Sequence, residues 1–260
     1  QFIPQVVHDQ DVKWGRKATY SYDYSKELCK EHHIRYYQLI TGLDNVVGDL
    51  MATLKEKGLD KNTIIIFGSD HGLLMGEYGM GGKALLYDLT SKYPCFVYDP
   101  RLPKGWRGKT IDNLVSSLDI TSTILDYAGV SQPREMQGES LRPLMTNPSI
   151  QWRDELFLES LYTGRDTPFS EGIRKGKWKY IRMFDGVVPY KEKHVNFKNR
   201  KPDFEQLFDL SKDPGEKNNL IAELERSDIL KTLRKRCQEH SDALNNRREE
   251  YKKTHEITVR

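Results

Sequence analysis

The first strong pattern in the chain is a stripe of apolar residues at three- and four-residue steps between residues 26 and 57. Its members are Tyr36, Ile40, Leu43, Val47, Leu50 and Leu54. This spacing predicts an amphipathic helix, and Gly58 offers a place for it to end. Two more helices are predicted, one over residues 113–128, followed by Gly129, and a charged one over residues 221–253.

Two short runs predict strands of a central sheet. Thr63–Phe67 is a continuous β-branched and aromatic run, which is typical of a strand buried on both faces. Cys95–Tyr98 is the second run, with Pro94 at its start, where a missing N–H is tolerated. We expect the Cys95 thiol to lie in the core, because a cysteine without a disulfide is commonly buried. Helix, loop and buried strand in this order indicate half of an α/β crossover unit.

The pattern changes near Trp152 to short stretches in which polar and apolar residues alternate. Strands are predicted at residues 155–160, 172–174 and 177–183, and the stretch FEQLFDLSKDPGEKNNL, residues 204–220, is strand-like at first and then rich in turn residues. The second and third of these are expected to form a hairpin with its turn at Lys175 and Gly176. The change favours a division into an α/β part, residues 1–150, and a smaller α+β part, residues 151–260.

Composition narrows the class of protein. The chain has 260 residues, 37% of them hydrophobic, and a net charge of +3. This mild charge, with no basic stripe among aromatic residues, does not favour nucleic acid as a partner. The longest aliphatic run is too short to cross a bilayer, so no membrane span is predicted. Three widely spaced cysteines without a CxxC pair indicate neither a zinc site nor a disulfide framework.

Residues suited to chemistry gather in the stretch FGSDHGLLMGEYGMGGK, residues 67–83. Asp70 and His71 directly follow a predicted strand, at the edge where open α/β sheets bind ligands. A carboxylate beside an imidazole can bind a divalent cation, although at least two further ligands would have to come from elsewhere. Lys83 ends the Gly-rich loop, and its ammonium suits a tetrahedral oxyanion such as sulfate or phosphate.

Each of these signals also has a simpler interpretation. An Asp-His pair after a strand is more often a helix cap or a local turn, and a Gly-rich loop with one lysine is a weak signal alone. The order of the signals changes the balance. A buried strand, SDHG, GEYG, GGK, an aromatic-acidic YD and a second strand follow one another within about forty residues. This order favours a site over a set of unrelated turns.

The same residues resemble the carboxy-terminal half of a formylglycine-dependent type I sulfatase of the alkaline phosphatase superfamily. The resemblance is carried by TIIIFGSDHG and MGEYGMGGKALLYDLTSKYPCFVY, where the family usually shows SDHG…GEHGLWGK…YE…R-P. It implies part of an alkaline-phosphatase-like sandwich with a central mixed, mostly parallel sheet flanked by helices. Residues 1–150 would be the carboxy-terminal portion of the catalytic domain. Residues 151–260 would be a small antiparallel-sheet subdomain with a long terminal helix.

The resemblance also implies roles for single residues. Asp70 and His71 would be two ligands of a divalent ion, Ca²⁺ by preference, with Mn²⁺ or Mg²⁺ as alternatives. Lys83 would contact the sulfate and steady the leaving alkoxide, and Glu77 and Tyr78 are expected to contact the substrate. Tyr78 stands where relatives often have histidine. The substrate would be a sulfated small molecule or glycan, and the family implies a secreted or periplasmic protein.

The nucleophile of the family is a formylglycine made from Cys or Ser in a C/S-x-P-x-R motif. The 260 residues contain no such motif, and Ser131, followed by QPR, is one residue short of the spacing. We therefore expect the formylglycine, and the partner of this chain, in a missing amino-terminal half of the same protein. Three hypotheses stay open: a partial sulfatase, a phosphodiesterase or phosphonate monoester hydrolase of the same superfamily, and a non-catalytic remnant or anion-binding module.

Overall fold

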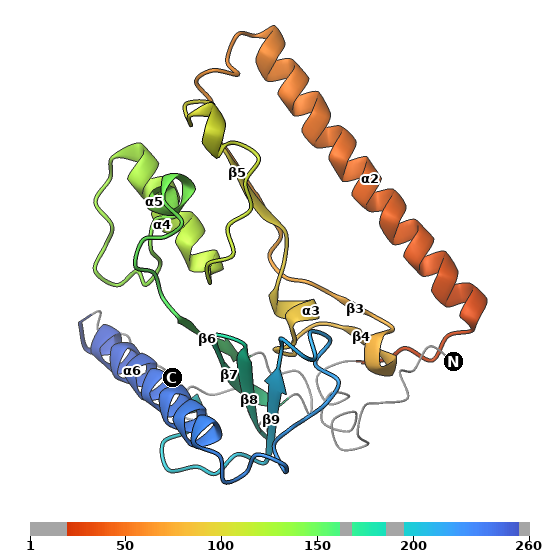
Figure 1. The fold of residues 1–260 in the computed structure, drawn as a ribbon, viewed down its shortest axis with the longest axis vertical. Helices are drawn as coiled ribbons and strands as arrows, with labels where there is room; N and C mark the ends of the chain where they lie inside the picture. Colours follow the sequence, from red (N-terminus) through yellow and green to blue (C-terminus); the bar gives the residue numbers. More distant parts are fainter. Residues whose placement is uncertain (1–19, 162–167, 186–194, 255–260) are drawn as a thin grey trace. The chain divides into compact units, whose positions relative to one another are not determined.

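The computed structural model describes residues 20–161, 168–185 and 195–254. The chain forms two compact units (Figure 1). The first unit contains Asp23–His71 and Tyr93–Asp154, and the second is formed chiefly by Gly72–Lys92 and Glu155–Arg260. The segment with the Gly-rich loop therefore belongs to the same unit as the carboxy-terminal residues.

The predicted helices of the first unit are present. Helix α2, Lys26–Glu56, begins after Ser25, whose side chain accepts a hydrogen bond from the Leu28 N–H at 3.2 Å. Helix α4 is Ser117–Ala128 and begins four residues later than predicted. Ser116 and Asp119 form a reciprocal capping box there, so the SSLD sequence fixes the start of the helix. The first unit also contains 3₁₀ helix η2, Lys104–Trp106, and helix α5, Arg142–Thr146.

Four of the six residues in the apolar stripe of α2 are exposed in this chain, and Val47 and Leu54 are half-buried. Side chains of large apolar residues along the helix are at least one-third exposed: Ile34, Tyr36, Tyr37, Leu39, Ile40, Leu43, Val46 and Leu50. The most exposed of them is Leu39, at 73%. A helix of 31 residues with such a stripe is normally packed on one face, because burial of that face supplies most of the stability of a helix in a protein.

The two predicted central strands form an antiparallel pair. Strand β2, Ile65–Gly68, pairs with β5, Cys95–Tyr98, in the register Ile65↔Tyr98 to Gly68↔Cys95. All strand pairings among the described residues are antiparallel, so the parallel strands of the expected sheet are not among them.

Two predictions about burial in this pair were wrong. Strand β2 is half-buried rather than covered on both faces, and Cys95 is exposed rather than in the core. The reason is that an apolar strand pattern shows a face suited to burial. It does not show whether described residues of the same chain cover that face.

A four-stranded antiparallel sheet organises the second unit. Its order is β6-β7-β8-β9, and the strands are Glu155–Ser160, Phe169–Lys175, Trp178–Phe184 and Phe204–Asp209. The predicted hairpin is confirmed between β7 and β8, with Gly176 in the left-handed conformation at a φ of 54°. Strand β7 is longer than the sequence pattern predicted, and β8 has the predicted length with its bounds shifted by one residue.

The two faces of this sheet carry different coverings. Helix α6, Asp228–Thr254, packs against one face (Figure 1), where Leu230, Leu233 and Cys237 meet Ile173 and Tyr180. It begins seven residues later than predicted, after Ser227, whose hydroxyl accepts a hydrogen bond from the Leu230 N–H at 3.3 Å. No helix among the described residues combines the length and the apolar composition that a membrane span needs.

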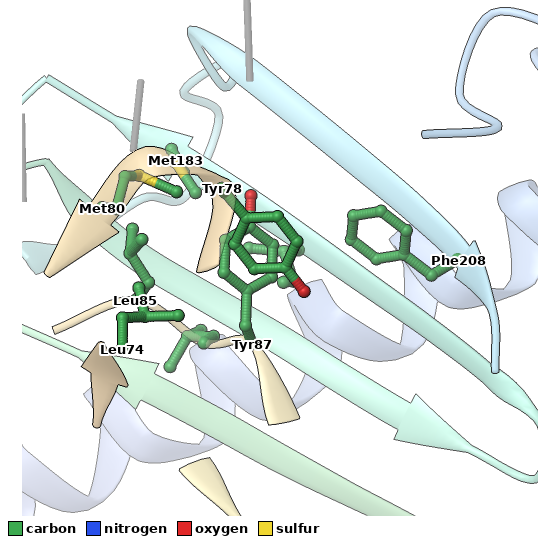
Figure 2. Close-up of a cluster of buried hydrophobic side chains, with 9 residues drawn as sticks. Leu74, Tyr78, Met80, Leu85, Tyr87, Met183 and Phe208 are labelled. Atoms are coloured by element: carbon green, nitrogen blue, oxygen red, sulfur yellow. The ribbon is translucent and has the colours of Figure 1, made fainter. Parts of the chain in front are cut away.

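The other face is covered by the Lys83 segment, residues 74–91. It contains strand β3, Leu74–Met75, 3₁₀ helix η1, Glu77–Gly79, strand β4, Met80–Gly82, and helix α3, Asp88–Ser91. A small sheet of order β1-β4-β3 includes strand β1, Tyr20–Ser21. Buried residues of the segment pack on β8 and β9 (Figure 2) and form one cluster: Leu74, Tyr78, Met80, Leu85, Leu86 and Tyr87 with Ile181, Met183 and Phe208.

We expect the second unit to lose stability in acid, because the stabilising contribution of the Glu155 carboxylate is lost there. Its carboxylate accepts hydrogen bonds from Arg236, from His240 at 2.9 Å and from Lys175 at 3.1 Å. Hydrogen bonding to Arg236 is the main cause that lowers the pKa of Glu155 from 4.5 to about 2. A carboxyl with a lowered pKa in the folded state stabilises the fold above pH 4.5, and this contribution disappears as the pH falls toward 2.

We expect Glu155→Gln to lower the free energy of unfolding by roughly 2–3 kcal/mol at pH 7 and by little near pH 2–3. Urea unfolding of the full-length protein at both pH values measures the difference. Glu249→Gln is the control, since this α6 carboxylate is 63% exposed and pairs with Lys252 at the surface. An equal loss at both pH values would contradict the prediction.

Candidate functional site

Asp70 and His71 lie next to each other directly after β2, in the first unit. The His71 Nε2 atom is 3.2 Å from Asp70 Oδ2, and the His71 N–H donates to Asp70 Oδ1 at 2.9 Å. The Ser69 hydroxyl donates to the His71 carbonyl at 3.0 Å. The Asp70 side chain is 81% exposed and that of His71 is 33% exposed. The two predicted ligands are therefore brought together with their polar atoms at the surface of the described chain.

The backbone around this pair is fixed by two contacts. The Ser69 N–H donates to the Pro94 carbonyl at 3.3 Å, which continues the β2–β5 pairing to the end of the strand. Gly72, which follows His71, lies against helix α3 in the second unit. A Cβ atom at position 72 would be 2.0 Å from the Leu89 carbonyl oxygen, so only glycine fits there. The glycine of the SDHG motif is thus required by close packing, not by a left-handed φ.

Lys83 lies in the second unit, just after β4, and its side chain is exposed. Gly76 and Gly82 have φ angles of 114° and 108°, which residues with a Cβ rarely adopt. Ala84 directly follows Lys83 and has a φ of 79°. The glycines thus supply the unusual backbone angles of this segment, while Met80 and Leu85 on either side of Lys83 are buried. Lys83 therefore has an exposed side chain on a segment whose neighbouring residues are closely packed.

Glu77 and Tyr78, the predicted substrate contacts, have partners within the second unit. The Glu77 carboxylate accepts a hydrogen bond from the Met75 N–H at 2.6 Å. Tyr78 is only 3% exposed, and its hydroxyl donates to the Gly215 carbonyl. Burial raises the pKa of this phenol above its usual range. Its ring lies 5.4 Å from that of Tyr87 (Figure 2). Contact of either residue with substrate stays a prediction.

The predicted site residues are thus divided between the units. Asp70 and His71 are in the first unit, whereas Lys83, Glu77 and Tyr78 are in the second. The sequence interpretation missed a buried ionic network that includes Asp88, a residue of the Lys83 segment. Lys179 contacts Asp88 at 2.7 Å and Glu216 at 2.8 Å. Contacts between residues 91 and 37 positions apart leave no periodic signal in a sequence, so no pattern could have indicated them.

A divalent ion would find part of its coordination shell in this chain. Among the described residues, no group of three or more His, Cys, Asp and Glu side chains is placed to bind one. The Asp70 carboxylate and the His71 imidazole, 3.2 Å apart, fit a pair of ligands that needs completion by other residues.

Comparisons with known proteins show the family of this chain. A family model described as N-sulphoglucosamine sulphohydrolase, C-terminal, matches residues 76–243, and one described as Sulfatase matches residues 5–130. The chain is 34% identical over 212 residues to an arylsulfatase of Clostridium perfringens, covering 81% of this chain and 40% of that protein.

Two solved structures are also similar. One is a 2-O GAG sulfatase, with a TM-score of 0.75 and 21% identity, covering 99% of this chain and 54% of that one. The other was solved in complex with its substrate D-glucosamine-2-N,6-O-disulfate, with a TM-score of 0.67 and 25% identity. It covers 80% of this chain and 40% of that one.

The fold is that of the alkaline-phosphatase-like sulfatases, as expected from the sequence. Because the first family model matches more than half of its residues, the chain belongs to the sulfatase family and represents its carboxy-terminal part. The chain spans 40% of the length of the arylsulfatase that it matches.

Proposed function

We propose that the protein containing this chain hydrolyses a sulfate ester on a sulfated carbohydrate. The observation that carries the proposal is the pairing of Asp70 with His71 at 3.2 Å, at the end of a strand, in a chain of the sulfatase family. Support for a carbohydrate comes from a similar protein whose substrate is a glucosamine disulfate. Secretion or export to the periplasm is part of the proposal.

The role proposed for Lys83 is electrostatic. Its exposed ammonium would contact a sulfate oxygen and offset the negative charge that develops on the leaving oxygen as the S–O bond breaks. The closely packed segment around it limits the motion of the backbone, so less reorganisation is needed when charge develops. Glu77 and Tyr78, in the same segment, are proposed to border the substrate.

The proposed metal ligands are Asp70 and His71. A bound divalent ion, proposed to be Ca²⁺, with Mn²⁺ and Mg²⁺ as alternatives, would supply Lewis-acid polarisation and orientation of the sulfate oxygens. The part of these two residues is to present one carboxylate and one imidazole nitrogen to the ion. The hydrogen bond from the His71 N–H at 2.9 Å keeps the Asp70 carboxylate oriented.

We expect Asp70→Asn to reduce metal retention by about 10- to 100-fold, because an amide oxygen replaces a charged ligand. The measurement is the metal content of the dialysed full-length protein by elemental analysis. Asp112→Asn is the control, since Asp112 is an exposed carboxylate of the first unit outside the proposed site. Equal metal content in Asp70→Asn and wild type would remove Asp70 from the ligand set.

We further propose that the amino-terminal half of a sulfatase, which would carry the formylglycine, is the partner of the first unit. Its support is the exposed stripe on α2 together with the exposed Phe96 on β5. Large apolar side chains that are exposed together along one helix mark an interface. The match covers only 40% of the arylsulfatase that is 34% identical, so the rest of that protein is long enough to contain such an amino-terminal half.

The 260-residue chain produced alone is therefore expected to self-associate. Sedimentation velocity should show aggregates or oligomers for the wild-type chain. Leu39→Lys with Val46→Lys should reduce association, since these α2 side chains are 73% and 62% exposed and the charges cost little there. A single monomeric species of the unmodified chain at micromolar concentration would contradict the proposed partner.

The function itself is tested with the full-length protein and three substrates. We expect hydrolysis of 4-nitrophenyl sulfate and of glucosamine 6-sulfate, with much slower hydrolysis of a 4-nitrophenyl phosphonate monoester. The reverse preference would favour a phosphonate monoester hydrolase. Binding of inorganic sulfate without turnover of any substrate would favour an anion-binding module.

A further inference from the structure

The two ends of the segment around Lys83 are both attached to residues 215–216, which follow β9. Five residues before Lys83, the Tyr78 hydroxyl donates to the Gly215 carbonyl. Five residues after it, the Asp88 N–H donates to Glu216 Oε2 at 2.5 Å. Lys83 is therefore at the centre of a chain reversal with both ends attached to neighbouring residues of one loop.

Lys179 on β8 joins these attachments. Its side chain is fully buried, and its Nζ atom lies 2.7 Å from Asp88 Oδ1 and 2.8 Å from Glu216 Oε1. Arg174 contacts the other oxygen of Asp88 at 3.1 Å. Glu216 is only 4% exposed, so its contact with Lys179 is an ion pair inside the fold. Burial raises the pKa of Glu216, and Lys179 partly offsets this effect.

A network of this kind is a poor way to stabilise a fold. The desolvation of buried charges offsets much of their attraction, and apolar residues of similar volume often stabilise as well or better. The network should matter more for the backbone geometry of the Lys83 segment than for the stability of the fold. Three non-glycine residues here have left-handed backbones: Tyr78, Ala84 and Glu216, with φ angles of 57°, 79° and 52°. Such conformations persist only where the surroundings determine them, and they concentrate at functional sites.

We propose that Lys179, acting with Glu216, is a positioning residue for Lys83. The buried ammonium draws Asp88 and Glu216 together and so fixes the carboxyl end of the reversal, while the Tyr78 hydroxyl fixes its amino end. The Lys83 ammonium is then kept where charge develops on the leaving oxygen. This inference rests on the proposed function, because it assigns Lys179 a role only through Lys83.

The test uses the full-length protein with two substrates that differ in leaving group, 4-nitrophenyl sulfate and phenyl sulfate. Phenolate is the poorer leaving group and needs more charge stabilisation, so loss of Lys83 should lower kcat more for phenyl sulfate. We expect Lys179→Met to lower kcat on phenyl sulfate by about 10- to 100-fold, and by less on 4-nitrophenyl sulfate. Added to Lys83→Ala, the same substitution should cause no further loss.

Arg182→Met is the matched control. Arg182 also lies on β8, is buried and pairs with buried Glu171 at 2.5 Å, but it faces α6, not the segment around Lys83. It should lower the melting temperature as Lys179→Met does and leave the ratio of the two kcat values unchanged. Tyr78→Phe removes one hydroxyl from the other attachment. It should show the leaving-group effect of Lys179→Met more weakly, and it decides the matter if Lys179→Met fails to fold.

The outcomes separate the two proposals. Wild-type kcat in Lys83→Ala would overturn the role of Lys83 itself. A leaving-group effect in Lys83→Ala, with none in Lys179→Met or Tyr78→Phe, would overturn the positioning role and leave the proposed function standing. Equal changes of the kcat ratio in Lys179→Met and Arg182→Met would also overturn it, since a general loss of stability would then be the cause.

Discussion

Lys83→Ala is expected to lower kcat on phenyl sulfate by about 10²- to 10³-fold, which is the loss typical when one group that stabilises developing charge is removed. The physical reason is that the alanine methyl group is uncharged and cannot offset the negative charge on the leaving oxygen. Stability should change little, because the Lys83 side chain is exposed and its buried neighbours Met80 and Leu85 are untouched. Steady-state kinetics and the melting temperature of the full-length protein measure the two effects.

Lys231→Ala is the control for this experiment. Lys231 lies on α6 in the same unit, is 65% exposed and pairs with Asp228 at the surface. It should leave kcat unchanged, which excludes an effect of net charge alone. If Lys83→Ala keeps at least half of the wild-type kcat on phenyl sulfate, Lys83 has no part in stabilising the leaving oxygen.

Asp119→Asn should cause the largest loss of stability in the first unit. The Asp119 carboxylate is fully buried and accepts hydrogen bonds from the Ser116 N–H at 2.7 Å and the Glu139 N–H at 2.8 Å. It also pairs with both terminal nitrogens of Arg153, at 2.7 and 2.9 Å. The asparagine amide would place a donor against these donors and leave Arg153 without its main counter-charge. The expected loss is about 3–5 kcal/mol.

The urea midpoint of the full-length protein gives the measurement, and Asp126→Asn is the control on the same helix. Asp126 pairs with Arg142 at 2.7 Å, but its side chain is 39% exposed, so its loss should cost at most about 1 kcal/mol. A shift for Asp119→Asn no larger than that for Asp126→Asn would show that Asp119 is not the centre of this network.

Local signals in the sequence predicted the elements, and the structure shows why. The end of α4 was predicted from Gly129, at a φ of 68°, whereas its start was predicted four residues too early because the capping box of Ser116 and Asp119 was not used. The β7–β8 hairpin follows from Gly176 at its turn. Each of these features depends on residues within four positions, so a sequence contains all the information that they need.

Features that depend on distant residues could not be predicted in this way. The exposure of Cys95 depends on what covers β5, and the pairing of Asp88 with Lys179 depends on contacts across 91 positions. Of the candidate site, the sequence could indicate the residue types and their order, through SDHG and GGK. It could not indicate the burial of Tyr78 or the bond from its hydroxyl to Gly215, because the two residues lie 137 positions apart in the sequence.

Residues 72–92 belong to the second unit, although in the sequence they lie between two segments of the first. This order restricts which segments two members of the family can exchange by recombination. A chimera that takes residues 155–260 from a relative and keeps its own residues 72–92 would combine halves of different origin at the Tyr78–Gly215 and Asp88–Lys179 contacts. Recombination between family members is therefore expected to succeed when both segments move together, although they are separated in the gene. The lysine-bearing part of the candidate site would then be inherited as two segments that are separate in the gene.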